Sequence, residues 1–132
     1  MYKYELIIKE HHLDSYGHVN NATYLALYEE ARWELISGRG YTYEKVHQTG
    51  QGPVILDVHL AFLKELKLRE KISITVEMLS YEGKIFKLKQ QMLKADGGVA
   101  SEAIFTGGFF DLKARKLILP SEEWLVAIGL KN

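Results

Sequence analysis

The 132-residue sequence contains no cysteine, only two prolines and no long apolar run. Without cysteine, the chain has no disulfide bond, no thiolate nucleophile and no cysteine-ligated metal site. No apolar stretch approaches the roughly 20 residues that a membrane-spanning helix needs. Few prolines and no glycine- or serine-rich segment leave no visible linker, so we expect one domain over residues 1–132.

The sequence also lacks an excess of charge of either sign. Lys and Arg together number 17, and so do Asp and Glu. This balance predicts no attraction to nucleic acid or to an anionic membrane. Residues 1–10 mix charged and apolar side chains and do not resemble a signal peptide. We therefore expect a cytoplasmic protein without nucleic-acid or membrane partners.

Apolar alternation predicts five β-strands, over residues 2–9, 54–63, 72–79, 85–93 and 99–112. In the second strand it places Val54, Leu56, Val58, Leu60 and Phe62 on one face. Hairpin turns are expected at residues 82–84 and 96–98. Gly107 and Gly108, inside the last strand, indicate a bulge or a close backbone approach. Strand, helices and then a run of strands favour an α+β fold with an antiparallel sheet.

A long helix is expected from about Asn21 to Ser37, after a polar loop. Asn20 and Asn21 are candidate N-caps, and Gly38 and Gly40 are stop signals. Its apolar stripe contains Tyr24, Leu27, Tyr28, Ala31 and Leu35, widened by Leu25 and Ile36, with Trp33 and Ala26 on the far side. Because apolar residues occupy more than one face, we expect the helix to be enclosed. Short helices are expected over residues 42–48 and after Ser121.

A lone carboxylate, Asp14, precedes the long helix. Asp14-Ser15-Tyr16-Gly17 has Asp and Gly at the positions that a type I turn favours. A turn alone accounts for these residues, but a turn can also hold a carboxylate in place for chemistry. Such a carboxylate can attack an acyl carbon or act as a general base toward water.

The start of the long helix is the second candidate feature. Unpaired N–H groups and the positive end of the helix dipole can polarise a carbonyl or stabilise an oxyanion. Most helix starts are only capped ends, but this one lies close in sequence to Asp14. Together the two features are sufficient, in outline, for hydrolysis of an activated acyl group such as a thioester.

Other polar residues nearby have both structural and functional interpretations. His18 could orient water or bind the thioester region, although a histidine between loop and helix is more often structural. Glu29 and Arg32 are spaced to pair on the helix, either in solvent or buried in support of the Asp14 region. Tyr24 is a core residue or a substrate contact.

Several other kinds of site are not indicated. His11, His12 and His18 lie near Asp14, but their spacing fits no zinc motif, and we expect no metal. The chain has no G-x-S-x-G motif, no phosphate-binding glycine loop and no dinucleotide-binding fingerprint.

Two segments carry a family resemblance: Asp14-Ser-Tyr-Gly17-His18-Val19-Asn20-Asn21-Ala-Thr-Tyr24 and Glu29-Glu-Ala-Arg32-Trp33. They resemble the hotdog-fold thioesterases of the 4-hydroxybenzoyl-CoA thioesterase group. Within that group, the two segments look most like the bacterial fatty acyl-CoA thioesterases. Length and element order extend the resemblance over nearly the whole chain. One departure is Lys64-Glu-Leu-Lys-Leu68, where many relatives have a proline after the second strand.

The resemblance implies a curved five-stranded antiparallel sheet wrapped around the long helix. It also implies a homodimer joined through sheet edges, often paired again into a homotetramer. Asp14 would be the nucleophile or general base, and the N–H of Asn21 would hold the thioester carbonyl, beside Asn20, His18, Gly17 and Tyr24. No cofactor is implied, because coenzyme A is part of the substrate. Contacts to its nucleotide do not carry over, and Lys67, Arg69 and Lys71 are more simply surface charges.

We therefore expect an acyl-CoA thioesterase of fatty acid metabolism, acting on medium- to long-chain substrates and releasing free acid and CoA. An acyl-thioester hydratase or dehydratase is an alternative, because such enzymes use a histidine in a position like that of His18. A non-catalytic acyl-CoA-binding domain is another. Release of free thiol distinguishes the thioesterase from both alternatives.

Overall fold

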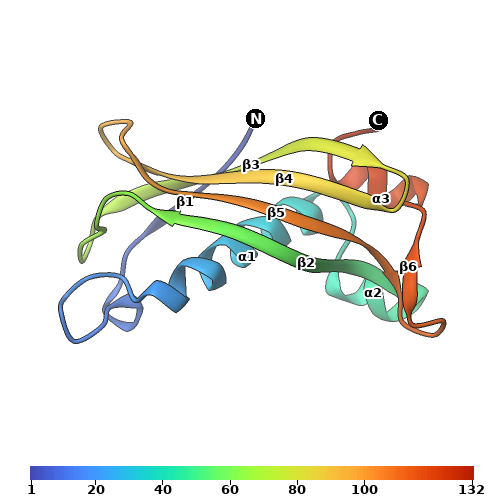
Figure 1. Cartoon of the computed structure of the whole chain (residues 1–132), viewed down its shortest axis with the longest axis horizontal. Coiled ribbons are helices and arrows are strands. Elements are labelled where there is room, and N and C mark those ends of the chain that lie inside the picture. Colours follow the sequence, from blue (N-terminus) through green and yellow to red (C-terminus); the bar gives the residue numbers. More distant parts are fainter.

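The computed structural model describes residues 1–132 as one antiparallel sheet with a long helix on one face (Figure 1). The elements, in chain order, are β1 (Tyr2–Ile7), the 3₁₀ helix η1 (Glu10–His12), α1 (Asn21–Gly38), α2 (Tyr43–Thr49), β2 (Gln51–Phe62), β3 (Lys71–Glu82), β4 (Ile85–Lys94), β5 (Val99–Asp111), β6 (Lys116–Ile118) and α3 (Glu122–Ala127). None of the helices is long and apolar enough to cross a membrane.

The strands are ordered β1-β3-β4-β5-β2, and every pair is antiparallel. The expected α+β class is confirmed, but the sheet has six strands instead of five. The extra strand, β6, pairs with Phe109–Asp111 of β5, beyond the point where β4 begins opposite Gly108. Three residues are too few to show an alternating pattern, so β6 could not be predicted from its residues.

Helix α1 forms where its cap and its apolar stripe predict it. The Asn20 side chain accepts a hydrogen bond from the Ala22 N–H. Six residues of the helix are buried against the sheet: Tyr24, Leu27, Tyr28, Ala31, Leu35 and Ile36. Leu25 and Ala26 are exposed on the opposite face. The expectation of an enclosed helix is therefore wrong for the single chain, because one sheet covers only one side of α1.

The alternation expected along β2 is interrupted by a bulge. Ile55 pairs with Gly107, and Asp57 pairs with Thr106, so Leu56 is the extra residue. A bulge reverses the order of faces along the strand. Val58, opposite the buried Phe105, faces the helix together with Ile55, whereas Val54 points to the other face. The prediction that Val54 shares a face with Val58 is therefore wrong.

The close backbone approach expected at the paired glycines is confirmed. A Cβ added at Gly107 would lie 2.5 Å from Phe86 Cζ and 2.6 Å from the Val54 carbonyl oxygen. One added at Gly108 would lie 2.7 Å from the Lys84 carbonyl oxygen. These contacts leave no room for a side chain. The bulge itself lies in the neighbouring strand β2.

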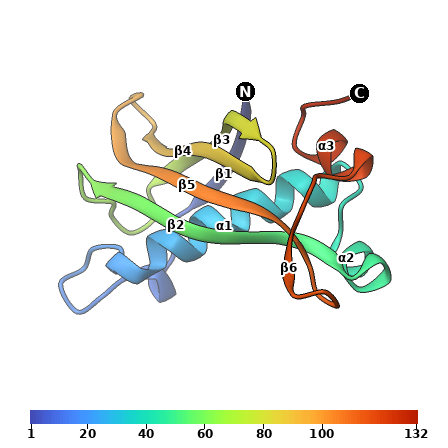
Figure 2. The same ribbon diagram turned by 45° about the vertical axis from the view of Figure 1, so that its right-hand side comes forward.

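The two ends of the molecule differ in character (Figures 1 and 2). At one end α2, β6 and α3 close the core around Tyr41, Phe109 and Trp124, whose rings lie 5.4–5.7 Å apart. Thr42 and Ser121 cap α2 and α3 as expected. At the other end the loop that carries Asp14 leads into α1. Any chemistry that uses Asp14 therefore takes place away from the aromatic end.

Candidate active site

The loop before α1 is held by its own backbone. The Gly17 N–H donates to the Asp14 carbonyl (3.2 Å), which closes the expected turn, and the Asp14 N–H donates to the His18 carbonyl (2.8 Å). Gly17 has a φ of +83°, a conformation that other residues adopt at a cost. The Val19 N–H reaches the carbonyl of Leu66, in the loop after β2. The turn therefore has a fixed position relative to the sheet.

The two carboxylate oxygens of Asp14 have different surroundings. Oδ1 accepts hydrogen bonds from the N–H groups of Tyr16 (2.9 Å) and His18 (3.3 Å). Oδ2 has no hydrogen-bond partner in the chain, and the side chain is half-buried. The turn therefore holds one oxygen and leaves the other available to a ligand or to water.

The first turn of α1 has a free N–H group that faces the loop of Asp14. The Ala22 N–H is capped by the Asn20 side chain, and the Thr23 N–H bonds to the Asn20 carbonyl (2.9 Å). The Asn21 N–H has no acceptor in the chain. This donor lies at the positive end of the helix dipole, where it can bind a carbonyl oxygen.

Asp14 and the start of α1 line the same groove, of about 600 Å³. His18, Asn20, Asn21 and Tyr24 also line it, together with Phe62–Glu65. Gly17 shapes the turn without lining the groove. The structure therefore brings together the carboxylate, the free N–H and an apolar wall in which the rings of Tyr24 and Phe62 meet edge to face, with centroids 4.9 Å apart.

His18 has a partner that the sequence did not indicate. Its Nε2 lies 2.7 Å from Oε2 of Glu65, and both side chains are about half exposed at 48%. Glu65 follows β2 and is far from His18 in the chain. The pair closes one side of the groove between the two loops.

The segment after β2 is the part of the site that sequence reasoning missed. The N–H groups of Leu63 and Lys64 both donate to the Ala100 carbonyl, at 2.9 and 3.1 Å, and Leu66 is fully buried. This is the segment without the proline of many relatives. The missing proline and the end of the predicted strand marked this segment in the sequence, but neither placed it beside Asp14.

Glu29 and Arg32 lie outside the groove. They line a separate cavity of about 230 Å³ with Trp33, Ile36, Pro53, Ile55 and Phe86. Glu29 is exposed, and the two side chains form no ion pair. Neither lines the groove of Asp14, so their supporting role there stays a prediction.

Arg32 instead belongs to a buried polar network beneath α1. Its Nη1 donates to Gln90 Oε1 (3.0 Å), and its guanidinium lies 4.4 Å from the centre of the Phe105 ring. The Gln90 amide donates to the Tyr28 carbonyl (3.2 Å), and the Tyr28 hydroxyl donates to Ser101 (2.8 Å). Burial lowers the pKa of Arg32 to about 10.

The basic residues Arg69 and Lys71 lie outside the groove of Asp14. Arg69 binds both carboxylate oxygens of Glu10 at 2.8 and 2.9 Å, so it is engaged in a surface ion pair. A larger hollow, of about 830 Å³, lies beside β1 and β3, and Lys71 lines it. That hollow contains neither Asp14 nor the start of α1. No group of three or more metal-binding side chains converges in the chain.

Comparison with known proteins identifies the family. The profile of the thioesterase-like superfamily matches residues 9–128. The chain belongs to this superfamily. The match includes the Asp14 turn, all of α1 and strands β2 to β6, and it begins after β1. The protein is therefore an enzyme of the thioesterase class, a hydrolase.

Two curated relatives support the assignment. The long-chain acyl-CoA thioesterase FadM of Escherichia coli K12 is 30% identical over 116 residues, which cover 86% of each chain. The chloroplastic acyl-acyl carrier protein thioesterase ATL3 of Arabidopsis thaliana is 28% identical over 102 residues, or 70% of this chain and 54% of that protein.

Solved structures agree on the fold. The probable thioesterase YbaW from Escherichia coli has a TM-score of 0.83 and 26% identity, covering 97% of this chain and 96% of that one. The protein SAV2348 from Staphylococcus aureus, solved in complex with CoA, has a TM-score of 0.89 and 18% identity, covering 96% and 80%. The hotdog fold implied by the sequence resemblance is confirmed.

Proposed function

We propose that the protein hydrolyses medium- to long-chain fatty acyl-CoA to the free acid and CoA at the groove of Asp14. The observation that carries this proposal is that the half-free carboxylate of Asp14 lines the same groove as Asn21, whose N–H has no acceptor in the chain. The FadM relative, a long-chain acyl-CoA thioesterase, supports the choice of substrate.

In the proposed reaction the thioester carbonyl accepts a hydrogen bond from the Asn21 N–H. This contact polarises the carbonyl and stabilises the negative charge that develops on its oxygen during attack. Asp14 Oδ2 either attacks the acyl carbon or removes a proton from the attacking water. The C–S bond then breaks, and CoA leaves as a thiolate, which needs no strong acid. No cofactor takes part.

The apolar side of the groove supports a fatty acyl group. Tyr24 and Phe62 form one wall, and Leu63, 57% exposed, continues it toward solvent. Covering an exposed leucine or phenylalanine with an acyl chain contributes about 25 cal/mol for each Å² of apolar surface removed from water. Hydrophobic contact thus supplies affinity, while Asp14 and Asn21 act on the thioester.

We also propose that two chains associate through the edge of β2. One side of this 12-residue strand pairs with β5, and no strand of the chain pairs with its other side. The strand exposes Ile55, Leu56, Val58 and Phe62, each between 37% and 53%. A long apolar strand edge of this kind readily pairs with another chain. Antiparallel pairing would give a homodimer, and two such dimers a tetramer.

A thiol-release assay over a panel of acyl donors tests the proposed activity. The panel contains acetyl-, octanoyl-, dodecanoyl-, palmitoyl- and benzoyl-CoA, with palmitoyl-acyl carrier protein added because of the ATL3 relative. We expect free CoA from the substrates of eight or more carbons, at kcat/KM values well above that for acetyl-CoA.

Preference for benzoyl-CoA or for the carrier-protein substrate would overturn the proposed substrate while leaving the thioesterase class in place. Silence with every donor, from folded protein that still binds acyl-CoA, would favour a binding domain. A change in enoyl absorbance without thiol release would favour a hydratase.

A further inference from the structure

One side-chain contact joins the two loops that form the groove of Asp14. His18, at the end of the turn before α1, and Glu65, in the segment after β2, both line this groove. His18 Nε2 lies 2.7 Å from Glu65 Oε2. Because an ionised carboxylate only accepts hydrogen bonds, Nε2 carries a proton and donates to Glu65. The contact fixes the orientation of the imidazole ring across the groove.

The backbone of His18 supports the carboxylate of Asp14. The His18 carbonyl accepts from the Asp14 N–H (2.8 Å), and the His18 N–H donates to Asp14 Oδ1 (3.3 Å). The second bond is longer than the usual range for N–H···O, whereas the Tyr16 N–H donates to the same oxygen at 2.9 Å. The bond from His18 is therefore the weaker of the two, and it is sensitive to small displacements of His18.

The tip of the turn has few other anchors. Tyr16, at the tip, is 83% exposed. The base of the turn is held by the backbone pairing of Leu13 with Val19. Among the side chains of residues 14–18, that of His18 is the one with a polar partner outside the turn. The position of the turn over the groove thus depends on what holds the His18 ring.

Glu65 is itself fixed to the sheet. Its carbonyl accepts a hydrogen bond from Lys94 Nζ (2.8 Å), at the end of β4. Lys94 also pairs with Glu70 at 2.8 Å, and both of these side chains are largely buried. The neighbouring Leu66 is fully buried. These contacts hold the backbone of Glu65 in place, so its carboxylate is a fixed point to which His18 binds.

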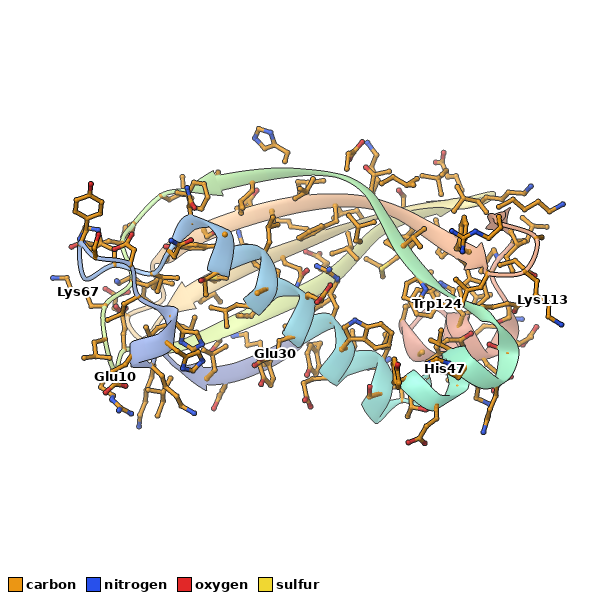
Figure 3. The ribbon with its side chains drawn as sticks, turned by 90° about the horizontal axis from the view of Figure 1, so that it is seen from below. Glu10, Glu30, His47, Lys67, Lys113 and Trp124 are labelled. Carbon is orange, nitrogen blue, oxygen red and sulfur yellow. The ribbon has the colours of Figure 1, made fainter.

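The carboxylate of Glu65 has a second, more distant cation. Lys67 Nζ lies 3.6 Å from Glu65 Oε1, farther than His18 Nε2 lies from Oε2. Figure 3 shows Lys67 at the same end of the molecule as Glu10, where the loop before α1 also lies. Its side chain is 69% exposed, so solvent screens its charge. Half-exposed pairs such as that of Glu65 and His18 add little to the stability of a fold. We therefore look for the effect of Glu65 in the geometry of the groove.

We propose that Glu65 is a positioning residue of the active site, which holds the ring of His18 and, through the backbone of His18, keeps Asp14 Oδ2 directed into the groove. Glu65 itself does not touch the reacting atoms. Without it, the turn samples more orientations, and fewer of them place the carboxylate for reaction. The inference rests on the proposed function and adds to it a residue from the segment after β2.

Steady-state kinetics with dodecanoyl-CoA test the proposal. We expect Glu65→Ala to lower kcat about 10- to 100-fold with little change in KM, because a misplaced carboxylate affects the reaction more than binding. Glu65→Gln retains an oxygen that accepts from His18 Nε2–H, and it should keep most of the activity. Glu122→Ala removes an exposed carboxylate from the surface ion pair with Lys131, at the far end of the molecule. It is the matched control and should leave kcat unchanged.

A double-mutant cycle tests whether Glu65 acts through His18. We expect His18→Ala to lower kcat by a similar factor, and Glu65→Ala/His18→Ala to be no slower than either single variant. Effects that multiply in the double variant would overturn the proposed route. A higher KM with unchanged kcat would also overturn it, because Glu65 and His18 would then serve substrate binding.

Amide hydrogen exchange measures the positioning without any substrate. The N–H groups of Tyr16 and His18, which hold Asp14 Oδ1, should exchange at least about 10-fold faster in Glu65→Ala than in the wild type, and Glu65→Gln should resemble the wild type. Equal exchange rates would overturn the inference even if every acyl donor were silent. An active wild type with unchanged kcat in Glu65→Ala would overturn the inference and leave the proposed function in place.

Discussion

Asn20 contributes both to the stability of α1 and to the geometry of the groove. Its side chain caps the Ala22 N–H at 2.9 Å, and its backbone precedes the free N–H of Asn21 in the groove. Replacing a capping Asn by Ala costs about 1 kcal/mol. We expect Asn20→Ala to lower the free energy of unfolding by about that amount, measured by urea denaturation, and to lower kcat/KM as the first turn frays. Asn20→Ser, which retains a cap, is the control, and equal stability of the two variants would contradict the assignment.

The residues of the site that could be predicted are those whose contacts are local in sequence. The Asp14 turn and the Asn20 cap each involve residues within four positions, so residue type and spacing were enough. The partner of His18 is Glu65, which reaches it only because β2 ends beside the turn. Arg32 was expected to pair with Glu29, but Gln90, on a strand across the core, holds it instead. No spacing rule could indicate these distant partners.

At the scale of elements, the close packing of β5 against its neighbours gives a stability prediction. In Gly107→Ala the added Cβ would lie within 2.6 Å of Phe86 Cζ and the Val54 carbonyl. Overpacking of this kind typically costs about 1–3 kcal/mol, and we expect a loss of stability in that range. Gly38→Ala, at the end of α1 with no atom within 4 Å of its added Cβ, should be neutral or stabilising. Thermal unfolding compares the two, and a tolerated Gly107→Ala would contradict the packing.

The η1 helix before the Asp14 turn gives a pH prediction. His12 Nδ1 accepts a hydrogen bond from the Lys9 N–H, and burial lowers the pKa of His12 below its usual 6.5. The unfolded chain therefore binds this proton more readily than the folded chain. The stabilisation from His12 is present above pH 6.5 and is lost as the pH falls toward the folded pKa.

The test compares melting temperatures at pH 7.5 and 5.5 for the wild type and His12→Asn, whose side-chain oxygen can take the place of Nδ1. The remaining titratable groups are the same in both proteins, so the difference isolates His12. The wild type should lose more stability on acidification than the variant. An equal loss would show that His12 does not contribute.

The order of elements could be predicted, whereas the faces of one strand could not. Alternation located all five long strands, and the caps located the three α-helices. The bulge at Leu56 lies in the run Val54-Ile55-Leu56, where three consecutive apolar residues interrupt the alternation without indicating which of them is the extra one. Opposite the bulge, Gly107 allows Phe86 and the Val54 carbonyl to approach the backbone closely, a contact between strands that spacing along one strand does not indicate.

At the scale of the whole molecule, the exposed side of α1 and the open edge of β2 connect fold to assembly. The apolar residues of α1 predicted an enclosed helix, but a single sheet covers only one side, and Leu25 is 40% exposed. A proposed partner along β2 would cover the adjoining flank. We expect specific activity to fall when the protein is diluted below the dimer dissociation constant, in step with dissociation seen by ultracentrifugation. Full activity of an isolated monomer would show that the groove is complete in one chain.

Turnover of Asp14→Asn measures whether Asp14 carries the chemistry of thioester hydrolysis. Asn retains an oxygen that can accept from the Tyr16 and His18 N–H groups, so the turn and the unfolding free energy should be unchanged. We predict that kcat for dodecanoyl-CoA falls by about 10²–10⁴-fold or more, while the variant still binds the substrate. Near-normal kcat in a folded Asp14→Asn protein would show that Asp14 is not the nucleophile or general base.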